Sequence, residues 1–179
     1  MSHLNTLRST IGFFRTLVTR YTPFDLSTPS IDGIFNFVRI DERWITSGQP
    51  TEEQLALVAE EGYRHVINLA PHGGENALPD EAATLDSLGV RYVHIPVDWQ
   101  RPTEEDFDAF CRAMAEISPA PVLVHCAANM RVSAFSYRYR TEVLDHDPVE
   151  ARRDLERLWQ PFGVWKEFVD GQAAGRSGP

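Results

Sequence analysis

The sequence predicts an α/β domain with a mainly parallel central sheet that is flanked by helices. Two observations support this prediction. Short apolar runs alternate with helical patterns along most of the chain, and strands that alternate with helices form βαβ units. The length of 179 residues, of which 42% are hydrophobic, suffices for one domain with a sizeable core. We therefore expect one domain over residues 31–170 and a flexible tail over residues 171–179.

Residues 1–22 form a separate segment, which we expect to be an amphipathic helix. Its apolar side chains recur at steps of three and four residues: Leu4, Leu7, Ile11, Phe14, Val18 and Tyr21. Arg15 interrupts the apolar stretch that a secretory signal needs. We expect the helix to dock on its own domain or on a second copy, which makes a homo-oligomer. An interfacial membrane helix or a targeting segment is the alternative.

The first half of the domain is expected to begin with two short strands and to continue with helices and strands in turn. The predicted strands cover 34–40, 44–46 and 66–69, and the predicted helices cover 51–61 and 79–88. Thr51, with Gln54 three residues later, predicts a capping box at the start of the first helix. Gly62 and Gly89 are expected to end the two helices.

The second half is expected to add two buried strands and four helices. The predicted strands cover 90–95 and 121–125, and the predicted helices cover 104–117, 131–144, 149–159 and 164–169. Thr103 is expected to cap the first of these helices. Ligands of such sheets bind at the carboxyl ends of the strands, so we expect the functional loops at 71–76, 96–102 and 126–131.

The composition excludes several classes of function. The formal net charge of −9 disfavours binding of nucleic acid, because an acidic surface repels the phosphate backbone. The two cysteines cannot build a disulfide framework or a four-cysteine zinc site, and they favour a reducing, cytoplasmic compartment. No apolar run is long enough for a stable membrane span. The histidines lack metal-binding spacing, so we expect no metal and no other cofactor.

The most informative stretch of the sequence is the loop that follows the strand 121–125. There the strand runs into Cys126, small residues follow, and Arg131 begins a helix. A helix N-terminus and successive loop amides bind an oxyanion, and the same field favours the nucleophilic thiolate form of a cysteine. The planar fork of Arg131 suits two phosphate oxygens. The loop residues expected to bind the phosphate are Ala127, Ala128, Asn129 and Met130.

Other side chains in and near this loop are expected to have distinct roles. Ser133 is expected to donate a hydrogen bond to the thiolate when it leaves, and His125 to fix the loop through its side chain. Asn129 is the best candidate for a positive φ angle in a loop without glycine. Cys111 lies beside Phe110 on a predicted helix, and we expect it to pack as a small hydrophobic residue.

The segment 125–133 resembles the signature loop of the cysteine-dependent phosphatases, which include the protein tyrosine phosphatases and the dual-specificity phosphatases. The usual pattern has five residues between cysteine and arginine, whereas this chain has four. Either the loop is one residue shorter and Arg131 still reaches the phosphate, or Val132 stands at the usual arginine position. We favour the first arrangement, because the second leaves the phosphate without a cation.

The resemblance to small bacterial phosphatase-like proteins extends from about Ile31 to Phe168. It includes the segments Ser47-Gly48-Gln49-Pro50 and Trp159-Gln160-Pro161. It implies a tyrosine-phosphatase-like fold of dual-specificity phosphatase size and a two-step reaction through a phosphocysteine. It also implies an aspartate upstream of the cysteine that acts as the general acid. Asp98, beside Trp99 in the loop 96–102, is our candidate, because Glu105 and Asp106 are better placed to stabilise the first turn of a helix.

We therefore expect a phosphomonoester hydrolase that acts on a phosphotyrosine protein or a small phosphomonoester. Two alternatives remain open: a non-catalytic phosphate-binding module, and thiol chemistry of the rhodanese or redox type. His72, Glu75 and Asn76 are expected in the substrate rim or in a solvated loop. Arg138 and Arg140 are expected on a solvated face. The aromatic residues near the C-terminus are expected in the core or at a docking surface: Trp159, Phe162, Trp165 and Phe168.

Overall fold

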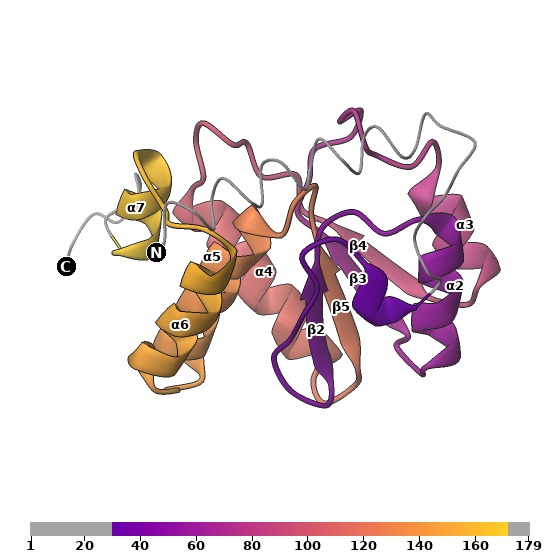
Figure 1. Ribbon diagram of the computed structural model, residues 1–179, viewed down its shortest axis with the longest axis horizontal. Helices are drawn as coiled ribbons and strands as arrows, with labels where there is room; N and C mark the ends of the chain where they lie inside the picture. The colour runs from indigo at the N-terminus through magenta and orange to yellow at the C-terminus, as the bar shows by residue number, and fades with distance from the viewer. Residues whose placement is uncertain (1–29, 172–179) are drawn as a thin grey trace.

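The computed structural model describes residues 30–171 and has a central sheet of five strands (Figure 1). The strands are β1 (Val38–Arg39), β2 (Trp44–Ser47), β3 (His65–Asn68), β4 (Arg91–His94) and β5 (Val122–His125). Their order in the sheet is β1-β2-β5-β3-β4. The four long strands are parallel, and β1 adds an antiparallel edge. The predicted α/β fold with a mainly parallel sheet is confirmed.

Helical segments connect the strands and complete the C-terminal part of the domain. They are η1 (Ile31–Gly33), α2 (Glu52–Glu60), α3 (Glu81–Ser87), α4 (Glu104–Ile117), α5 (Met130–Arg138), the π-helix η2 (Tyr139–Val143), α6 (Pro148–Leu158) and α7 (Val164–Val169). The capping box predicted at Thr51 is present, and Thr103 forms a second one with Asp106. These reciprocal bonds satisfy amides that a helix start otherwise leaves unpaired.

The predicted strand over 34–40 is largely wrong. Only Val38–Arg39 pairs with the sheet, because a short 3-10 turn comes first and Asn36 adopts a φ of 52°. A residue in this left-handed region interrupts an extended strand. The predicted helix over 131–144 is confirmed, with its last turns in the wider π form.

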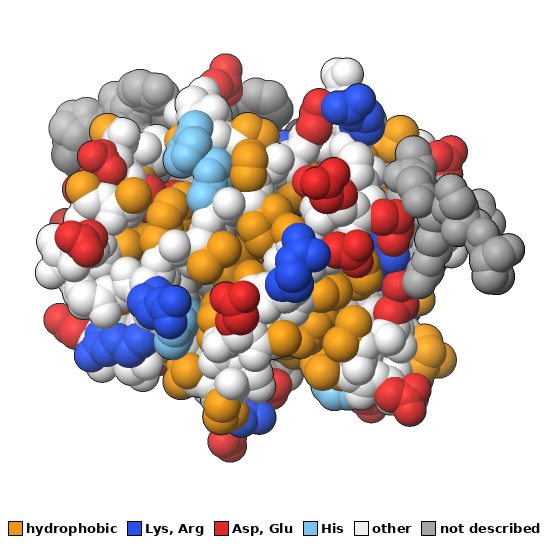
Figure 2. All heavy atoms as spheres, turned by 180° about the vertical axis from the view of Figure 1, so that it is seen from behind, with side chains coloured by type: hydrophobic (Ala, Val, Ile, Leu, Met, Phe, Trp, Pro, Cys, Tyr) orange, Lys and Arg blue, Asp and Glu red, His pale blue; other side chains and the backbone are white. Residues whose placement is uncertain are grey.

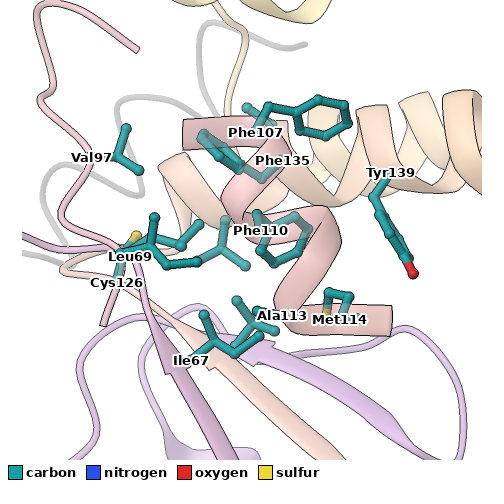
Figure 3. Close-up of a cluster of buried hydrophobic side chains, with 14 of the residues drawn as sticks. Ile67, Leu69, Val97, Phe107, Phe110, Ala113, Met114, Cys126, Phe135 and Tyr139 are labelled. Atoms are coloured by element: carbon teal, nitrogen blue, oxygen red, sulfur yellow. The ribbon is translucent and has the colours of Figure 1, made fainter. Parts of the chain in front are cut away.

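Helices cover both faces of the sheet, as Figure 1 shows. Successive strand residues alternate between two hydrophobic clusters, as expected for side chains that point to opposite faces. Val66 and Leu123 belong to the cluster with α2 and α3, and Ile67 and Val124 belong to the cluster with α4 and α5. Figure 3 shows Ile67 close to residues of α4, including Phe110. The two clusters fix the sheet between its helices.

Arg138 does not lie on a solvated face, so that prediction was wrong. Its side chain is fully buried and forms paired hydrogen bonds of 2.6–3.0 Å with Glu104 and Glu142. Its guanidinium carbon lies 4.0 Å from the ring centre of Phe107 and 4.6 Å from that of Phe168. Burial alone lowers the pKa of Arg138, but the two carboxylates outweigh it and raise the pKa.

Arg140 is also buried, and it forms an ion pair of 2.6 Å with Asp154 on α6. The expectation of a solvated face was therefore wrong for both arginines, because carboxylates on neighbouring helices neutralise them. Among the C-terminal aromatic residues, Trp159, Trp165 and Phe168 are in the core, as predicted. Phe162 is exposed.

The expectations for residues 1–22 and for the tail beyond Gly171 lie outside the described residues. Within residues 30–171, no helix combines the length and the apolar character that crossing a membrane requires. On the face in Figure 2, acidic side chains are interspersed with basic ones, so the negative net charge is not gathered into one patch there.

Candidate active site

The candidate nucleophile, Cys126, directly follows β5, which lies between β2 and β3. Its backbone amide donates a hydrogen bond of 3.3 Å to Ser47 at the end of β2. The side chain is 1% exposed and belongs to the core cluster. Figure 3 shows Cys126 at the edge of this cluster, beside Leu69. The thiol is therefore at the base of the loop 126–130 rather than at the protein surface.

The loop after Cys126 is held by hydrogen bonds to two of its carbonyl oxygens. The Ala127 oxygen accepts a hydrogen bond of 2.9 Å from Asn76 Nδ2. It also accepts one of 3.3 Å from the backbone N–H of Gln49. Asn36 Nδ2 donates to the Ala128 oxygen over 2.9 Å. The carbonyl and the following N–H of a trans peptide point in opposite directions. These bonds therefore direct the next amides to the other side of the loop, where successive amides can surround an oxyanion.

Asn129 adopts the left-handed backbone conformation that the sequence predicts, with a φ of 62°. Its side chain does not cap α5. Instead, Nδ2 donates to the Asn36 oxygen over 2.7 Å and to Thr46 Oγ1 over 3.0 Å. Asn36 and Asn129 thus brace the loop against the start of the domain. The sequence alone gave no signal for the contribution of Asn36.

Gly48 allows the segment 47–50 to approach this loop closely. A Cβ atom at Gly48 would lie 2.9 Å from the Phe35 ring and 3.1 Å from the Ala127 oxygen. Gly48 also forms an isolated bridge with Ala128. A side chain at this position would displace the nucleophile loop, so the approach requires glycine.

Arg131 lies in the first turn of α5 and contacts the loop 96–102. Its Nε donates to the Val97 oxygen over 3.0 Å, and its guanidinium carbon lies 5.3 Å from the Trp99 ring centre. Trp99 packs in turn between Trp159 and Trp165. The contact with Val97 engages Nε and not the two terminal amino groups. These contacts therefore hold the guanidinium of Arg131 against the loop 96–102, and Arg131 also lines a pocket together with Ala127.

Ser133, expected to donate to the Cys126 thiolate, and Asp98, expected to be the acid, form hydrogen bonds with other residues in this structure. The Ser133 hydroxyl donates to the Met130 oxygen over 2.9 Å and accepts from Trp159 Nε1 over 3.0 Å. Asp98 is exposed, and its carboxylate accepts from the Gln100 amide over 2.8 Å. Both residues thus belong to the segments around the nucleophile loop, but these hydrogen bonds join them to residues other than Cys126.

A buried carboxylate near the loop is a feature that sequence reasoning missed. Glu81 Oε1 lies 2.6 Å from His125 Nε2, and both residues are buried. Asn68 Nδ2 donates to Glu81 Oε2 over 2.8 Å. Burial alone raises the pKa of Glu81. The charge of His125 and hydrogen bonds from His125, Gln49 and Asn68 outweigh this effect and hold the pKa below its usual value.

Glu81 was not distinguished from the other residues of the helix predicted over 79–88. It is the first residue of α3, where a negative charge also suits the helix dipole. Only the tertiary structure places it against His125, which ends β5. The side chain of His125 was expected to fix the loop, but in this structure its partner is Glu81 on α3 and not a loop residue.

A pocket of about 260 Å³ adjoins the nucleophile loop. Ala127 and Arg131 contribute to its lining. Most of the other lining residues come from the segment 70–82, and they include His72 and Asn76, two of the three expected rim residues. Cys111, by contrast, is partly buried on α4, where burial and then the charge of Asp108 raise its pKa to about 11. This agrees with the packing role predicted for that thiol.

No group of three or more histidine, cysteine or acidic side chains in residues 30–171 is arranged to hold a metal ion.

Comparisons with known proteins agree with this geometry. A family model described as "DSP-PTPase phosphatase fused to NAD+ Kinase" matches residues 24–164. A beta-lactamase hydrolase-like protein of Xylella fastidiosa (strain Temecula1) is 39% identical over 121 residues, which are 64% of this chain and 27% of the relative. The chain therefore spans a minor part of that relative.

Solved structures share the fold. A DUF442 protein from Shewanella putrefaciens CN-32 superposes with a TM-score of 0.71 at 34% identity, over 79% of this chain and 93% of that one. The core catalytic domain of the PP-IP phosphatase SIW14 from S. cerevisiae has a TM-score of 0.66 at 13% identity, over 80% and 88% of the two chains. At that identity the likeness concerns the fold alone. The expected tyrosine-phosphatase-like fold is confirmed.

Proposed function

Because the chain belongs to the family of dual-specificity-type phosphatase domains described as fused to NAD+ kinase, we propose that it is a cysteine-dependent phosphomonoester hydrolase. Family and fold support a phosphatase of the tyrosine or dual-specificity type. In this proposal Cys126 is the nucleophile, Arg131 holds the phosphate and Asp98 is the acid and base. The substrate is a phosphotyrosine protein or a small phosphomonoester.

The observation that supports this proposal best is the bracing of the loop between Cys126 and Arg131. The outward bonds to the Ala127 and Ala128 oxygens direct the next amides inward. These amides and the N-terminus of α5 favour an anion beside Cys126. In this proposal the short loop therefore still supplies the phosphate site that transfer to a cysteine requires.

The proposed reaction has two steps. The Cys126 thiolate attacks phosphorus, and the leaving oxygen takes a proton from Asp98 as the phosphorus–oxygen bond breaks. Water then attacks the phosphocysteine, gives a proton to the Asp98 carboxylate and releases phosphate and the thiolate. Arg131 and the loop amides stabilise the charge on the phosphoryl oxygens in both steps. General acid catalysis of this kind contributes roughly 10²–10⁴-fold.

Replacement of the nucleophile tests the proposal directly. We expect Cys126→Ser to lower kcat for a phosphotyrosine peptide by about a thousandfold or more, because the hydroxyl is a weaker nucleophile. The matched control is Cys111→Ser, which should leave turnover unchanged. Phosphate release is the measurement. Unchanged turnover in Cys126→Ser would show that another residue attacks phosphorus.

The role of Asp98 is tested with Asp98→Asn, whose side-chain oxygen still accepts the bond from the Gln100 amide. We expect kcat to fall about a hundredfold for a phosphotyrosine peptide and much less for p-nitrophenyl phosphate, whose leaving group needs little protonation. Asp106→Asn is the control, because Asp106 serves the capping box of α4. A large loss only in Asp106→Asn would transfer the acid role to that residue.

Phosphate binding without turnover is a second candidate function. The burial of Cys126 and the engagement of the Asp98 carboxylate by Gln100 favour it. This function predicts that inorganic phosphate or vanadate binds while no phosphomonoester in a broad panel is hydrolysed. Calorimetric titration beside a phosphate-release assay distinguishes the two functions. Cyanide-dependent thiocyanate formation would indicate rhodanese chemistry instead.

A further inference from the structure

The loop that carries Asp98 is held on both sides of that residue. Before Asp98, the Val97 oxygen accepts a hydrogen bond of 3.0 Å from Arg131 Nε. After it, the Trp99 oxygen accepts a hydrogen bond of 2.8 Å from Trp165 Nε1. The side chain of Asp98, by contrast, is exposed. The backbone at Asp98 is thus anchored through its two neighbours, while the carboxylate remains open to solvent.

The two anchors differ in their relation to the proposed reaction. Arg131, which holds the Val97 oxygen, is also the proposed phosphate ligand. Val97 itself is buried in the same hydrophobic cluster as Cys126 (Figure 3). Trp165 lies on α7 and has no part in the proposed reaction steps. Its hydrogen bond to the loop of the candidate acid therefore needs an explanation of its own.

The indole of Trp165 is a donor with a well-defined position. Its side chain is 1% exposed, and its ring centre lies 5.5 Å from that of Phe168 and 6.3 Å from that of Phe135. The Trp99 ring packs against it at 5.1 Å. A ring in a close-packed interior cannot turn without opening a void, so the direction of its N–H is fixed. The bond to the Trp99 oxygen therefore restrains the loop and not the indole.

Proton transfer to a leaving oxygen depends on this kind of restraint. A general acid must come within hydrogen-bond distance of the oxygen that it protonates, and a small misplacement lowers the rate. The exposed carboxylate of Asp98 lacks the packing that fixes a buried side chain. Its position is therefore determined mainly by the backbone on either side.

We propose that Trp165 is a positioning residue for the protonation of the leaving group. Its indole N–H holds the Trp99 oxygen, and the backbone held in this way places the Asp98 carboxylate at the leaving oxygen. Trp165 acts through the loop and does not itself contact the substrate. The inference rests on the proposed function for the role of Asp98 as the acid, and it adds a residue to which no step had been assigned.

Two esters that differ by one nitro group test this role in Trp165→Phe, which keeps an aromatic ring but lacks the N–H. Phenyl phosphate has a basic leaving oxygen that needs a proton, whereas that of p-nitrophenyl phosphate needs little protonation. We expect kcat to fall about three- to tenfold for phenyl phosphate and less than about twofold for p-nitrophenyl phosphate. A purely structural defect lowers both in proportion. Equal losses, or no loss, would overturn the inference.

Trp159→Phe is the matched control. Trp159 is also buried and its ring lies 5.5 Å from that of Trp99, but its Nε1 donates to Ser133 Oγ over 3.0 Å. The ratio of the two kcat values should keep its wild-type value in this variant, whatever the loss in each. A shift as large as that in Trp165→Phe would attribute the effect to indole packing and contradict the inference.

A full-length chain with benzothienylalanine at position 165 removes the donor without creating a cavity, because sulfur replaces the N–H in a ring of nearly the same shape. We expect it to reproduce the selective loss of phenyl phosphate turnover. This chain decides the question even if Trp165→Phe does not fold. A wild-type ratio of the two kcat values in it would show that the hydrogen bond does not position the acid.

Asp98→Asn, measured with the same two esters, separates this inference from the proposed function. If Asp98→Asn loses phenyl phosphate turnover selectively and the position-165 variants do not, the acid role stands and the inference fails. If all of them lose it selectively, both are supported. If Asp98→Asn shows no selective loss, Asp98 is not the acid and both are overturned. A chain that hydrolyses neither ester would overturn the hydrolase proposal and, with it, the role of Trp165.

Discussion

Asparagine side chains hold the loop that follows Cys126. Asn76 and Asn36 bond to its carbonyl oxygens, while Asn129 supplies the left-handed residue that glycine often supplies in tight loops. The positive φ of Asn129 was predictable, because asparagine tolerates that conformation and the loop has no glycine. The hydrogen bonds from Asn36 and Asn76 to the loop could not be predicted, because each residue is distant from the loop in sequence.

Two substitutions at Asn129 separate backbone strain from lost hydrogen bonds. Both Asn129→Gly and Asn129→Ala remove the bonds to Asn36 and Thr46, but only alanine is strained at the φ of 62° that this position requires. We expect Asn129→Ala to lower the free energy of unfolding by about 1 kcal/mol more than Asn129→Gly. Urea denaturation measures this difference. Equal stabilities would mean that the loop relaxes to another backbone conformation.

The Glu81–His125 pair predicts a dependence of stability on pH. The pKa of Glu81 is lowered from 4.5 in the folded protein, so its carboxylate stabilises the fold above about pH 4.5. This contribution is lost as the pH falls through the lowered pKa. We expect Glu81→Gln to reduce the free energy of unfolding by about 3 kcal/mol at pH 7. The difference from the unmodified chain should shrink below about pH 4.5.

Glu52→Gln is the matched control for this prediction. Glu52 is the first residue of α2, as Glu81 is of α3, but it is exposed. Both variants remove a charge at a helix start, but only Glu81→Gln removes a carboxylate that is buried against His125. A similar loss of stability in the two variants, measured by urea denaturation from pH 3 to 7, would show that the helix dipole rather than His125 accounts for the effect.

At the scale of elements, the helix starts were the most predictable features. Thr51 and Thr103 carry their signals within three residues, and both caps are present. The edge strand was predicted least well, because β1 has only two residues and its pairing depends on β2. The burial of Arg138 was also missed. Its partner Glu104 belongs to α4, so no local pattern joins the two.

Arg138 should be sensitive even to lysine. Its guanidinium bonds two carboxylates and stacks on two rings, which an ammonium group cannot reproduce. We expect Arg138→Lys to lower the free energy of unfolding by about 2 kcal/mol or more. Arg152→Lys is the control, because Arg152 has a similar glutamate partner four residues later but is only half-buried. That variant should change stability by less than about 0.5 kcal/mol. Equal losses in thermal denaturation would contradict the role of burial.

At the scale of the molecule, the periodicity of the sequence predicted the fold, but the sequence predicted only part of the site. Alternating strands and helices predicted the parallel sheet, and the position of Cys126 after β5 predicted the site at its carboxyl edge. The pocket wall was less predictable. It combines segments that are distant in sequence, and Glu81 contributes to it through contacts that only packing creates.

Residues 1–22 lead to a prediction about the oligomeric state. We expect deletion of residues 1–22 to convert an oligomer to a monomer, because these residues carry the predicted apolar helix face. The deletion should leave hydrolysis of p-nitrophenyl phosphate unchanged, since the described site lies within residues 30–171. Light scattering gives the mass. An unchanged mass would favour docking of the helix on its own domain.

The stacking of Arg131 on Trp99 also makes the site optically observable. The Trp99 ring lies within about 6 Å of the centres of two further indoles, Trp159 and Trp165. An anion that draws the guanidinium towards the loop changes the electric field at the first member of this indole group. We therefore expect the intrinsic fluorescence of the unlabelled chain to change when an anion occupies the loop, whether or not the bound molecule is turned over.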